Sequence, residues 1–158
     1  MTVDLAEVAR NVVAESEVAV DREVTIDTMP TIAAVDVPKV ERIVENLLVN
    51  AARHTPPRAH IWIRVRPTAD GAILAVEDDG PGLPPEDRER VFGPFERGGS
   101  AAAHAPGSGI GLTLVARFAE LHGGRAWAEE RDGGGASFLV WLPQTLDVSR
   151  SGAAAAPG

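Results

Sequence analysis

The chain has 158 residues, of which 44% are hydrophobic, with a formal net charge of −8 and no cysteine. This length suits one domain with its own core, and the acidic balance argues against a nucleic-acid surface, which needs clustered lysine and arginine. The lack of cysteine excludes disulfides and thiolate metal sites. Because no apolar run approaches about 18 residues and the N-terminus is charged, neither a membrane span nor a signal peptide is predicted.

The first third of the chain is expected to hold two helices with a strand between them. Residues 4–18 carry apolar side chains at helical spacing, and residues 23–27 alternate as a strand does. The longest predicted helix covers residues 35–55, with Asp36 as its N-cap and Pro56-Pro57 as its end.

The rest of the chain predicts hairpins and two further helices. The expected strands are 60–67, 71–78, 125–131 and 137–143, and the expected helices are 85–92 and 109–124. The Gly/Ala/Pro-rich stretch 93–108 is long enough to be a lid, and the low-complexity tail 148–158 leaves one domain over residues 1–147. Helices interspersed with hairpins indicate an α/β fold, a two-layer sandwich whose mixed, mostly antiparallel sheet is covered on one face.

Two asparagines in the longest helix form the first candidate site. Asn46 and Asn50 are four residues apart and therefore share a face, with Arg53 and His54 following one turn later. Asparagine is a poor helix former, and its carbonyl oxygen suits Mg²⁺ when phosphates supply most of the negative charge. Two exposed asparagines without a function are the alternative interpretation.

The second candidate is "VEDDGPGLP", residues 76–84, at the end of a predicted strand. Asp78 can accept a hydrogen bond from an exocyclic amine such as that of adenine, and Gly80 and Gly82 allow the backbone to approach a flat ring. A plain Asp-Gly turn is the alternative. A calcium loop is excluded because its first ligand position would be Ala75, inside the strand.

Two further segments flank the expected lid. In "VFGPFERGG" the phenylalanines are expected to anchor the base of the lid, while Arg97 is free to reach a phosphate; an ordinary apolar loop anchor is the alternative. The second, "GSGIGLTL", opens a helix with glycines, whose backbone N–H groups can bind an anion. It is neither a dinucleotide fingerprint, since Leu112 stands where its last glycine belongs, nor a P-loop, since no Gly-Lys-Ser/Thr occurs.

In this order and at these spacings, the four segments resemble the catalytic ATP-binding domain of sensor histidine kinases, over roughly residues 4–143. That family belongs with the gyrase, Hsp90 and MutL ATPases, which share the Bergerat (GHKL) α/β sandwich. The resemblance implies that the chain binds Mg-ATP and donates the γ-phosphate to a histidine on a separate dimerisation hairpin, in two-component signalling with a response regulator. It also implies a cytoplasmic location, which would include the cytoplasmic part of a membrane-bound sensor kinase. No contact of this segment with nucleic acid or with a membrane is implied.

The resemblance assigns roles to residues at the phosphate end of the nucleotide. Asn50 would ligate Mg²⁺ with help from Asn46. Arg53 would contact phosphate and Arg97 would approach the γ-phosphate, which completes the expected catalytic set. The residues that would hinge the lid and contact the triphosphate are Gly107, Gly109, Ile110, Gly111 and Leu112.

At the base end, the resemblance makes Asp78 the acceptor of the adenine amino group. The ring of His54 would lie near the adenine, and Gly80 and Gly82 would shape the pocket. The later "GGGASF" resembles the family's last glycine box more weakly.

Two departures from related ATPases bear on the activity. Asn46 stands where the gyrase-like ATPases carry a water-activating glutamate, and Glu45 points about 100° away on the helix; both favour phosphoryl transfer over hydrolysis. Only about one helix precedes the first strand, and none of the four histidines lies in an acidic helical hairpin. The domain is therefore expected not to phosphorylate itself. The alternatives are an anti-sigma-factor-type serine kinase of the same fold and a nucleotide-binding module without transfer activity.

Overall fold

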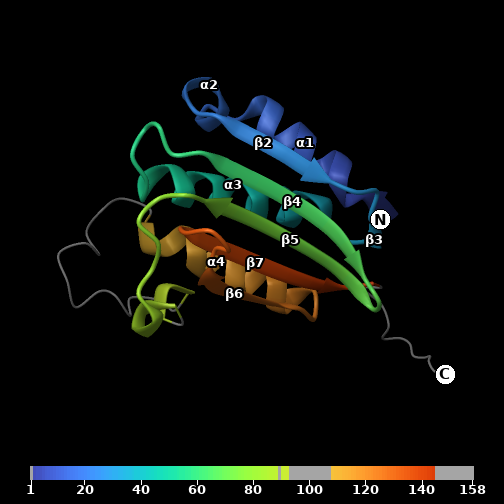
Figure 1. Ribbon diagram of the computed structural model, residues 1–158. Coiled ribbons are helices and arrows are strands. Elements are labelled where there is room, and N and C mark those ends of the chain that lie inside the picture. The colour runs from blue at the N-terminus through green and yellow to red at the C-terminus, as the bar shows by residue number, and fades with distance from the viewer. Residues whose placement is uncertain (1, 89, 93–107, 145–158) are drawn as a thin grey trace.

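The computed structural model describes residues 2–88, 90–92 and 108–144, with side chains described from Gly111 onward in the last segment. A five-stranded sheet forms one layer, and three helices lie against one of its faces (Figure 1). The sheet order is β2-β4-β5-β7-β6, in which β2 and β4 are parallel and all other neighbours are antiparallel. The strands are β2 Val24–Thr28, β4 Ile61–Thr68, β5 Gly71–Asp78, β6 Arg125–Glu130 and β7 Ala136–Pro143. The predicted mixed, mostly antiparallel sheet with one covered face is confirmed.

The helices of the second layer are α1 (Leu5–Glu15), α3 (Val37–Arg53) and α4 (Ser108–Leu121). The Asp36 carboxylate caps α3 by accepting the Lys39 N–H at 3.3 Å. It also pairs with the Lys39 ammonium at 2.8 Å, and this interaction holds the pKa of Asp36 below its usual value. The predicted N-cap of the longest helix is thus confirmed.

Alternate side chains of the strands and the apolar stripe of α3 form a single core. The largest fully buried side chains include Leu5, Val40, Ile43, Val44, Leu47, Leu48, Ile61, Ile63, Val65, Val115 and Leu142. Successive side chains of a strand point to opposite faces, so the remaining side chains of β4, β5 and β7 lie on the other face of the sheet, which no described helix covers. Ala75 and Ser137 on that face are nevertheless buried.

Two helix predictions were wrong in detail. Residues 4–18 do not form one helix, because α1 ends at Glu15 and the Ser16 hydroxyl accepts the N–H of Val18, which begins the short α2 (Val18–Asp21). The described residues of the range 85–92 form two 3-10 turns, η1 (Pro85–Asp87) and η2 (Arg90–Phe92), in place of one helix. Eight residues are too few for an α-helix to be stable without extensive packing, and single 3-10 turns are common in such connections.

One element was not predicted, a two-stranded ribbon of β1 (Thr2–Asp4) and β3 (Ile32–Ala34). Its three-residue strands are too short to show alternation in the sequence. The Asp4 carboxylate joins the ribbon to α1, since one oxygen accepts from Ala6 N–H at 3.0 Å and from Thr31 N–H at 2.9 Å.

The expected lid, 93–108, lies outside the described residues except for Ser108, the first residue of α4, and the tail 148–158 lies outside them entirely. Within the part of the chain that is described, no helix is long and apolar enough to cross a membrane.

Candidate functional site

The two candidate asparagines lie on α3, and Asn46 is next to Gly111 near the start of α4. Asn50 is 5% exposed and Asn46 is half-buried, and the Nδ2 atoms of both are buried without a hydrogen-bond partner among the described residues. A Cβ placed on Gly111 would lie 3.3 Å from Asn46 Oδ1, so that glycine lets α4 approach α3 closely. Buried amide groups are nearly always hydrogen-bonded in proteins. This pair therefore has hydrogen-bonding capacity left for a ligand.

Asp78 lies at the end of β5, on the covered face of the sheet, and is 3% exposed. Its Oδ1 accepts the Gly80 N–H at 2.9 Å, and no described lysine or arginine forms an ion pair with it. Burial raises the pKa of the Asp78 carboxyl, opposed by the hydrogen bonds from Gly80 and Ala136. A buried carboxylate without a cation is costly, which is typical of a residue retained for binding.

Two glycines allow neighbouring backbone segments to pack closely around Asp78. A Cβ on Gly135, in the β6–β7 turn, would lie 1.9 Å from the Asp78 carbonyl oxygen, and one on Gly82 would lie 3.4 Å from the Gly135 carbonyl oxygen. The glycine-rich turn after β6 thus packs directly on the segment that follows β5. The "GGGASF" segment, the weakest of the sequence motifs, is part of this arrangement.

Two residues that support the site, Thr55 and Arg22, were not predicted from the sequence. A Cβ on Gly80 would lie 2.7 Å from Thr55 Cγ2, so Thr55 packs against the loop of Asp78. The Arg22 guanidinium donates to Thr55 Oγ1 at 2.7 Å and to the carbonyl oxygens of Ala52 and Thr55 at 2.7 and 3.0 Å. The position of Thr55 directly after the helix is a weak signal for its role, whereas Arg22 is 33 residues from Thr55 in the chain and only the fold brings them together.

The structure places the remaining predicted site residues as follows. Arg53 and His54 are exposed at the end of α3, where His54 Nδ1 lies 2.9 Å from the Asn50 carbonyl oxygen. Leu112 is buried in the core. Gly109 and Ile110 belong to the first turn of α4, while Arg97 and Gly107 lie outside the described residues.

Two of the other histidines make contacts within the scaffold. His122 is buried, with Nδ1 2.8 Å from the Phe118 carbonyl oxygen while Nε2 accepts the Asp36 N–H at 3.1 Å. His60 stacks against Trp62 with ring centroids 4.3 Å apart. His104 lies outside the described residues.

Residues 35–146, well over half of the chain, match the family described as histidine kinase-, DNA gyrase B- and HSP90-like ATPase. The chain belongs to this ATPase family. Among curated members it is similar to the sensor protein KdpD of Escherichia coli strain K12, with 40% identity over 114 residues. It is also similar to the histidine-protein kinase/phosphatase MprB of Mycobacterium avium strain 104, with 41% identity over 123 residues. These matches cover 72% and 75% of this chain but only 13% of KdpD and 23% of MprB.

Solved structures of this ATPase family show the same fold. A mycobacterial sensor histidine kinase MprB has a TM-score of 0.78 and 32% identity over 92% of this chain and 99% of that one. The catalytic domain of the histidine kinase ThkA has a TM-score of 0.81 and 25% identity over 93% of this chain and 97% of that one. The resemblance to sensor histidine kinases and their α/β sandwich is confirmed.

Proposed function

We propose that this ATPase-family domain, over residues 1–147, binds Mg-ATP and donates the γ-phosphate to a histidine on a separate dimerisation hairpin. The observation that carries the proposal is the pair of buried amides of Asn46 and Asn50, whose Nδ2 atoms lack hydrogen-bond partners among the described residues; Asn46 lies next to Gly111 of α4. Membership of the ATPase family supports ATP as the nucleotide, and the unpaired amides support a phosphate and metal site at Asn46 and Asn50.

At the phosphate end, the two amides suit a metal ion whose other ligands are mainly phosphate oxygens. Each amide offers one neutral oxygen, and Mg²⁺ binds to few protein oxygens when phosphates and water complete its coordination. Asn50 and Asn46 would hold the ion, which would neutralise charge on the phosphates during transfer. Their N–H groups would donate to phosphate oxygens, with Arg53 close by on the last turn of α3. Arg97 and the glycines 107, 109 and 111 are proposed to complete the phosphate contacts, with the backbone of Ile110 and Leu112.

At the base end, Asp78 would accept the adenine amino group. Its carboxylate is buried, accepts hydrogen bonds from the backbone N–H groups of Gly80 and Ala136 and is unpaired with any described lysine or arginine, so a further N–H donor from the base would stabilise it. Gly80 and Gly82 lie next to Asp78 in the loop, and His54 is the C-cap residue of α3. Guanine would present a carbonyl oxygen to the carboxylate in place of the amine, which predicts a preference for ATP over GTP.

Transfer is favoured over hydrolysis by the residues of α3. The Asn46 amide cannot take a proton from water, and Glu45 is exposed on another part of the helix surface. The acceptor histidine would come from a dimerisation hairpin, on the same full-length chain or another, because His122 and His60 are committed to scaffold contacts. Alone, the domain should bind ATP without labelling itself. A response regulator would then take the phosphoryl group from the hairpin.

The test compares two nucleotide forms by calorimetric titration. Asn50→Ala should weaken Mg-ATP binding much more than the binding of metal-free ADP, because only the first needs the metal ligand. The exposed Asn11→Ala on α1 is the matched control and should change neither. Equal weakening of both forms by Asn50→Ala would make Asn50 a structural residue and remove the basis of the proposal.

The transfer step is tested by adding histidine hairpins from related sensor kinases to the domain with labelled ATP. Acid-labile, alkali-stable label should appear on the hairpin and not on this chain. Such label on this chain alone would contradict the proposal that the acceptor histidine lies on a separate hairpin.

A further inference from the structure

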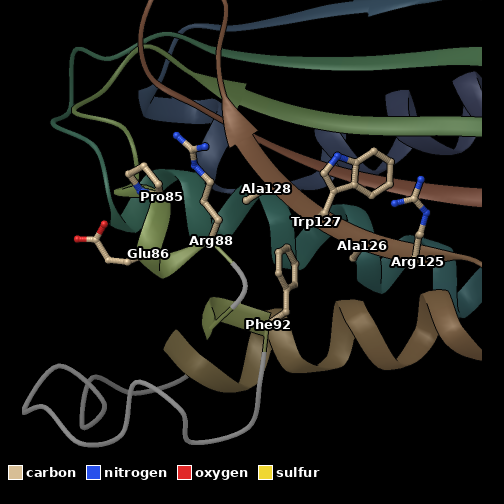
Figure 2. A pocket seen from close by; sticks show the side chains of 8 residues that line it. All are labelled: Pro85, Glu86, Arg88, Phe92, Arg125, Ala126, Trp127 and Ala128. Atoms are coloured by element: carbon tan, nitrogen blue, oxygen red, sulfur yellow. The ribbon is translucent and has the colours of Figure 1, made fainter.

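A second potential binding site lies along the outer edge of β6, separate from the residues proposed to bind nucleotide. A groove of about 630 Å³ runs beside this strand. One wall consists of four consecutive β6 residues, Arg125 to Ala128, and the other comes from η1, η2 and the residues near them (Figure 2). The second wall contributes Pro85, Glu86, Arg88 and Phe92.

The backbone of β6 has hydrogen-bonding groups to spare on this side. It is the last strand of the sheet and pairs only with β7 among the described strands. Alternate N–H and C=O groups of such an edge strand point away from the sheet and can pair with another extended segment. Residues 125–128 also make no other backbone hydrogen bond within the described part of the chain.

The groove has a basic group at each end. Arg88 extends toward β6 near Ala128, and its Nε is buried without a hydrogen-bond partner among the described residues. At the other end Arg125 lies over the Trp127 ring, 4.3 Å from its centroid. Neither arginine forms an ion pair with a described carboxylate, and Glu86, the only acidic residue in the lining, points away from the strand. The lining residues thus carry two arginines against one glutamate in a chain of net charge −8, and the Glu129 carboxylate lies beside the groove, where it accepts from Trp127 Nε1 at 2.8 Å.

We propose that the β6 groove binds an extended segment of a partner protein that carries an acidic side chain at each end, by adding it as a strand to the sheet. Residues 125–128 span roughly 10 Å at about 3.3 Å per residue, so four or so residues would fit alongside. The carboxylates would pair with Arg88 and Arg125, while apolar side chains between them would contact Phe92 and Trp127. Because η1 and η2 form a wall opposite β6, the groove suits one extended segment rather than the edge of a second sheet.

The test uses the whole chain and the peptide Ac-Glu-Val-Val-Glu with a fluorophore on its C-terminal amide, followed by fluorescence anisotropy. Saturable binding is expected, with Arg88→Glu and Arg125→Glu each weakening it by about tenfold or more, as expected for the loss of one charged hydrogen bond. Arg42→Glu, an exposed arginine on α3 outside the groove, makes the same charge change and should leave binding unaltered within twofold.

Two control peptides separate strand addition from simple charge attraction. Replacing both glutamates by lysine should abolish binding. Methylating the central backbone nitrogens, which removes their hydrogen-bond donors, should weaken binding at least tenfold if the peptide pairs with β6. Equal binding of the methylated peptide, or indifference to both arginine variants, would overturn the proposal.

A direct measurement is independent of the variants. Hydrogen exchange at the outward amides of residues 125–128 should slow when the peptide is present, while ATP binding should be unchanged within twofold. Protection confined to other strands, or a dimer of the chain that the peptide does not displace, would also count against the proposal.

Discussion

Two adjacent carboxylates of β5, Glu77 and Asp78, lie on opposite faces of the sheet and have opposite surroundings. Glu77, on the open face, accepts from Arg64 Nε at 2.9 Å and Ser137 Oγ at 3.1 Å, and lies 3.7 Å from Arg131 Nε. Asp78, on the helix-covered face, has no described cationic partner and a pKa raised by burial. The arginines of the open face therefore neutralise the charge of Glu77, whereas Asp78 on the covered face has no lysine or arginine partner among the described residues.

The open face repeats this pattern beyond Glu77. The Asp27 carboxylate is bound by both Arg64 and Arg66, and the hydrogen bond from Arg66 is the main reason that the pKa of Asp27 is lowered. The Arg131 guanidinium also lies over the Trp62 ring, 3.9 Å from its centroid. Such partly exposed pairs contribute little each to stability. They neutralise the Asp27 and Glu77 carboxylates of this face.

The largest expected effect comes from the turn that packs on Asp78. Gly135 and Gly134 have nearly equal φ angles, +108° and +109°, but only Gly135 would place a Cβ against Asp78. Gly134→Ala should cost about 1–3 kcal/mol of stability through backbone strain alone. Gly135→Ala should cost a further 1–3 kcal/mol or so through steric overlap, and should also weaken ATP binding.

Denaturant unfolding and ATP titration of the two variants check this prediction. Gly134→Ala is the matched control, since a Cβ there meets nothing within 4 Å. If both variants lost the same stability and kept full ATP affinity, the turn would not support Asp78.

The next largest effect is expected when Asp78 and Glu77 are each replaced by alanine. Asp78→Ala should weaken ATP binding by roughly ten- to hundredfold, because a hydrogen bond to a charged acceptor is worth about 1.5–3 kcal/mol. Glu77→Ala should leave ATP affinity within about twofold and lower stability only modestly, as expected for a partly exposed ion pair. Calorimetric titration with ATP and GTP measures both variants. A loss of ATP affinity in Glu77→Ala as large as in Asp78→Ala would remove the distinction between the two faces.

A smaller effect is expected for Arg22, which bonds the end of α3 from outside the site. Arg22→Ala should lower stability by about 1–2 kcal/mol, since it leaves carbonyl groups at the end of α3 without their donor. ATP affinity should fall a few-fold, because Thr55 supports the loop of Asp78, and Arg22→Lys should recover part of it. Arg10, which makes one exposed hydrogen bond to Thr28 Oγ1 at 3.3 Å, provides the control variant Arg10→Ala. Thermal unfolding and ATP titration together would show whether Arg22 affects stability alone.

The smallest effect is the pH dependence of stability in the absence of nucleotide. The folded-state pKa of Asp78 is raised, so its contribution is most favourable below its unfolded value, near 3.8, and is lost as pH rises through the folded value. Asp78→Asn should remove that loss, so its stability relative to the native chain should be higher at neutral pH than in acid. Urea unfolding at several pH values measures the difference. A relative stability that falls as pH rises would mean that the pKa of Asp78 is lowered in the folded state.

Local patterns in the sequence were sufficient to predict the elements that depend on contacts between residues close together in the chain. The Asp36 cap, the stripe of α3 and the hairpin of β4 and β5 each depend on residues a few positions apart, and each appears as predicted. The spacing of the four nucleotide segments was enough to indicate the family, which the comparisons confirm. Whether each predicted residue contacts nucleotide remains a prediction.

Tertiary structure decided what depends on distant residues. Alternation in β5 shows that Glu77 and Asp78 lie on opposite faces, but only the packing of the helices determines which carboxylate is buried. The β1–β3 ribbon, the parallel pairing of β2 with β4 and the bond from Arg22 to Thr55 join segments far apart in the chain. Such contacts form only when the whole fold offsets the entropy of bringing the segments together, so no short stretch of sequence encodes them.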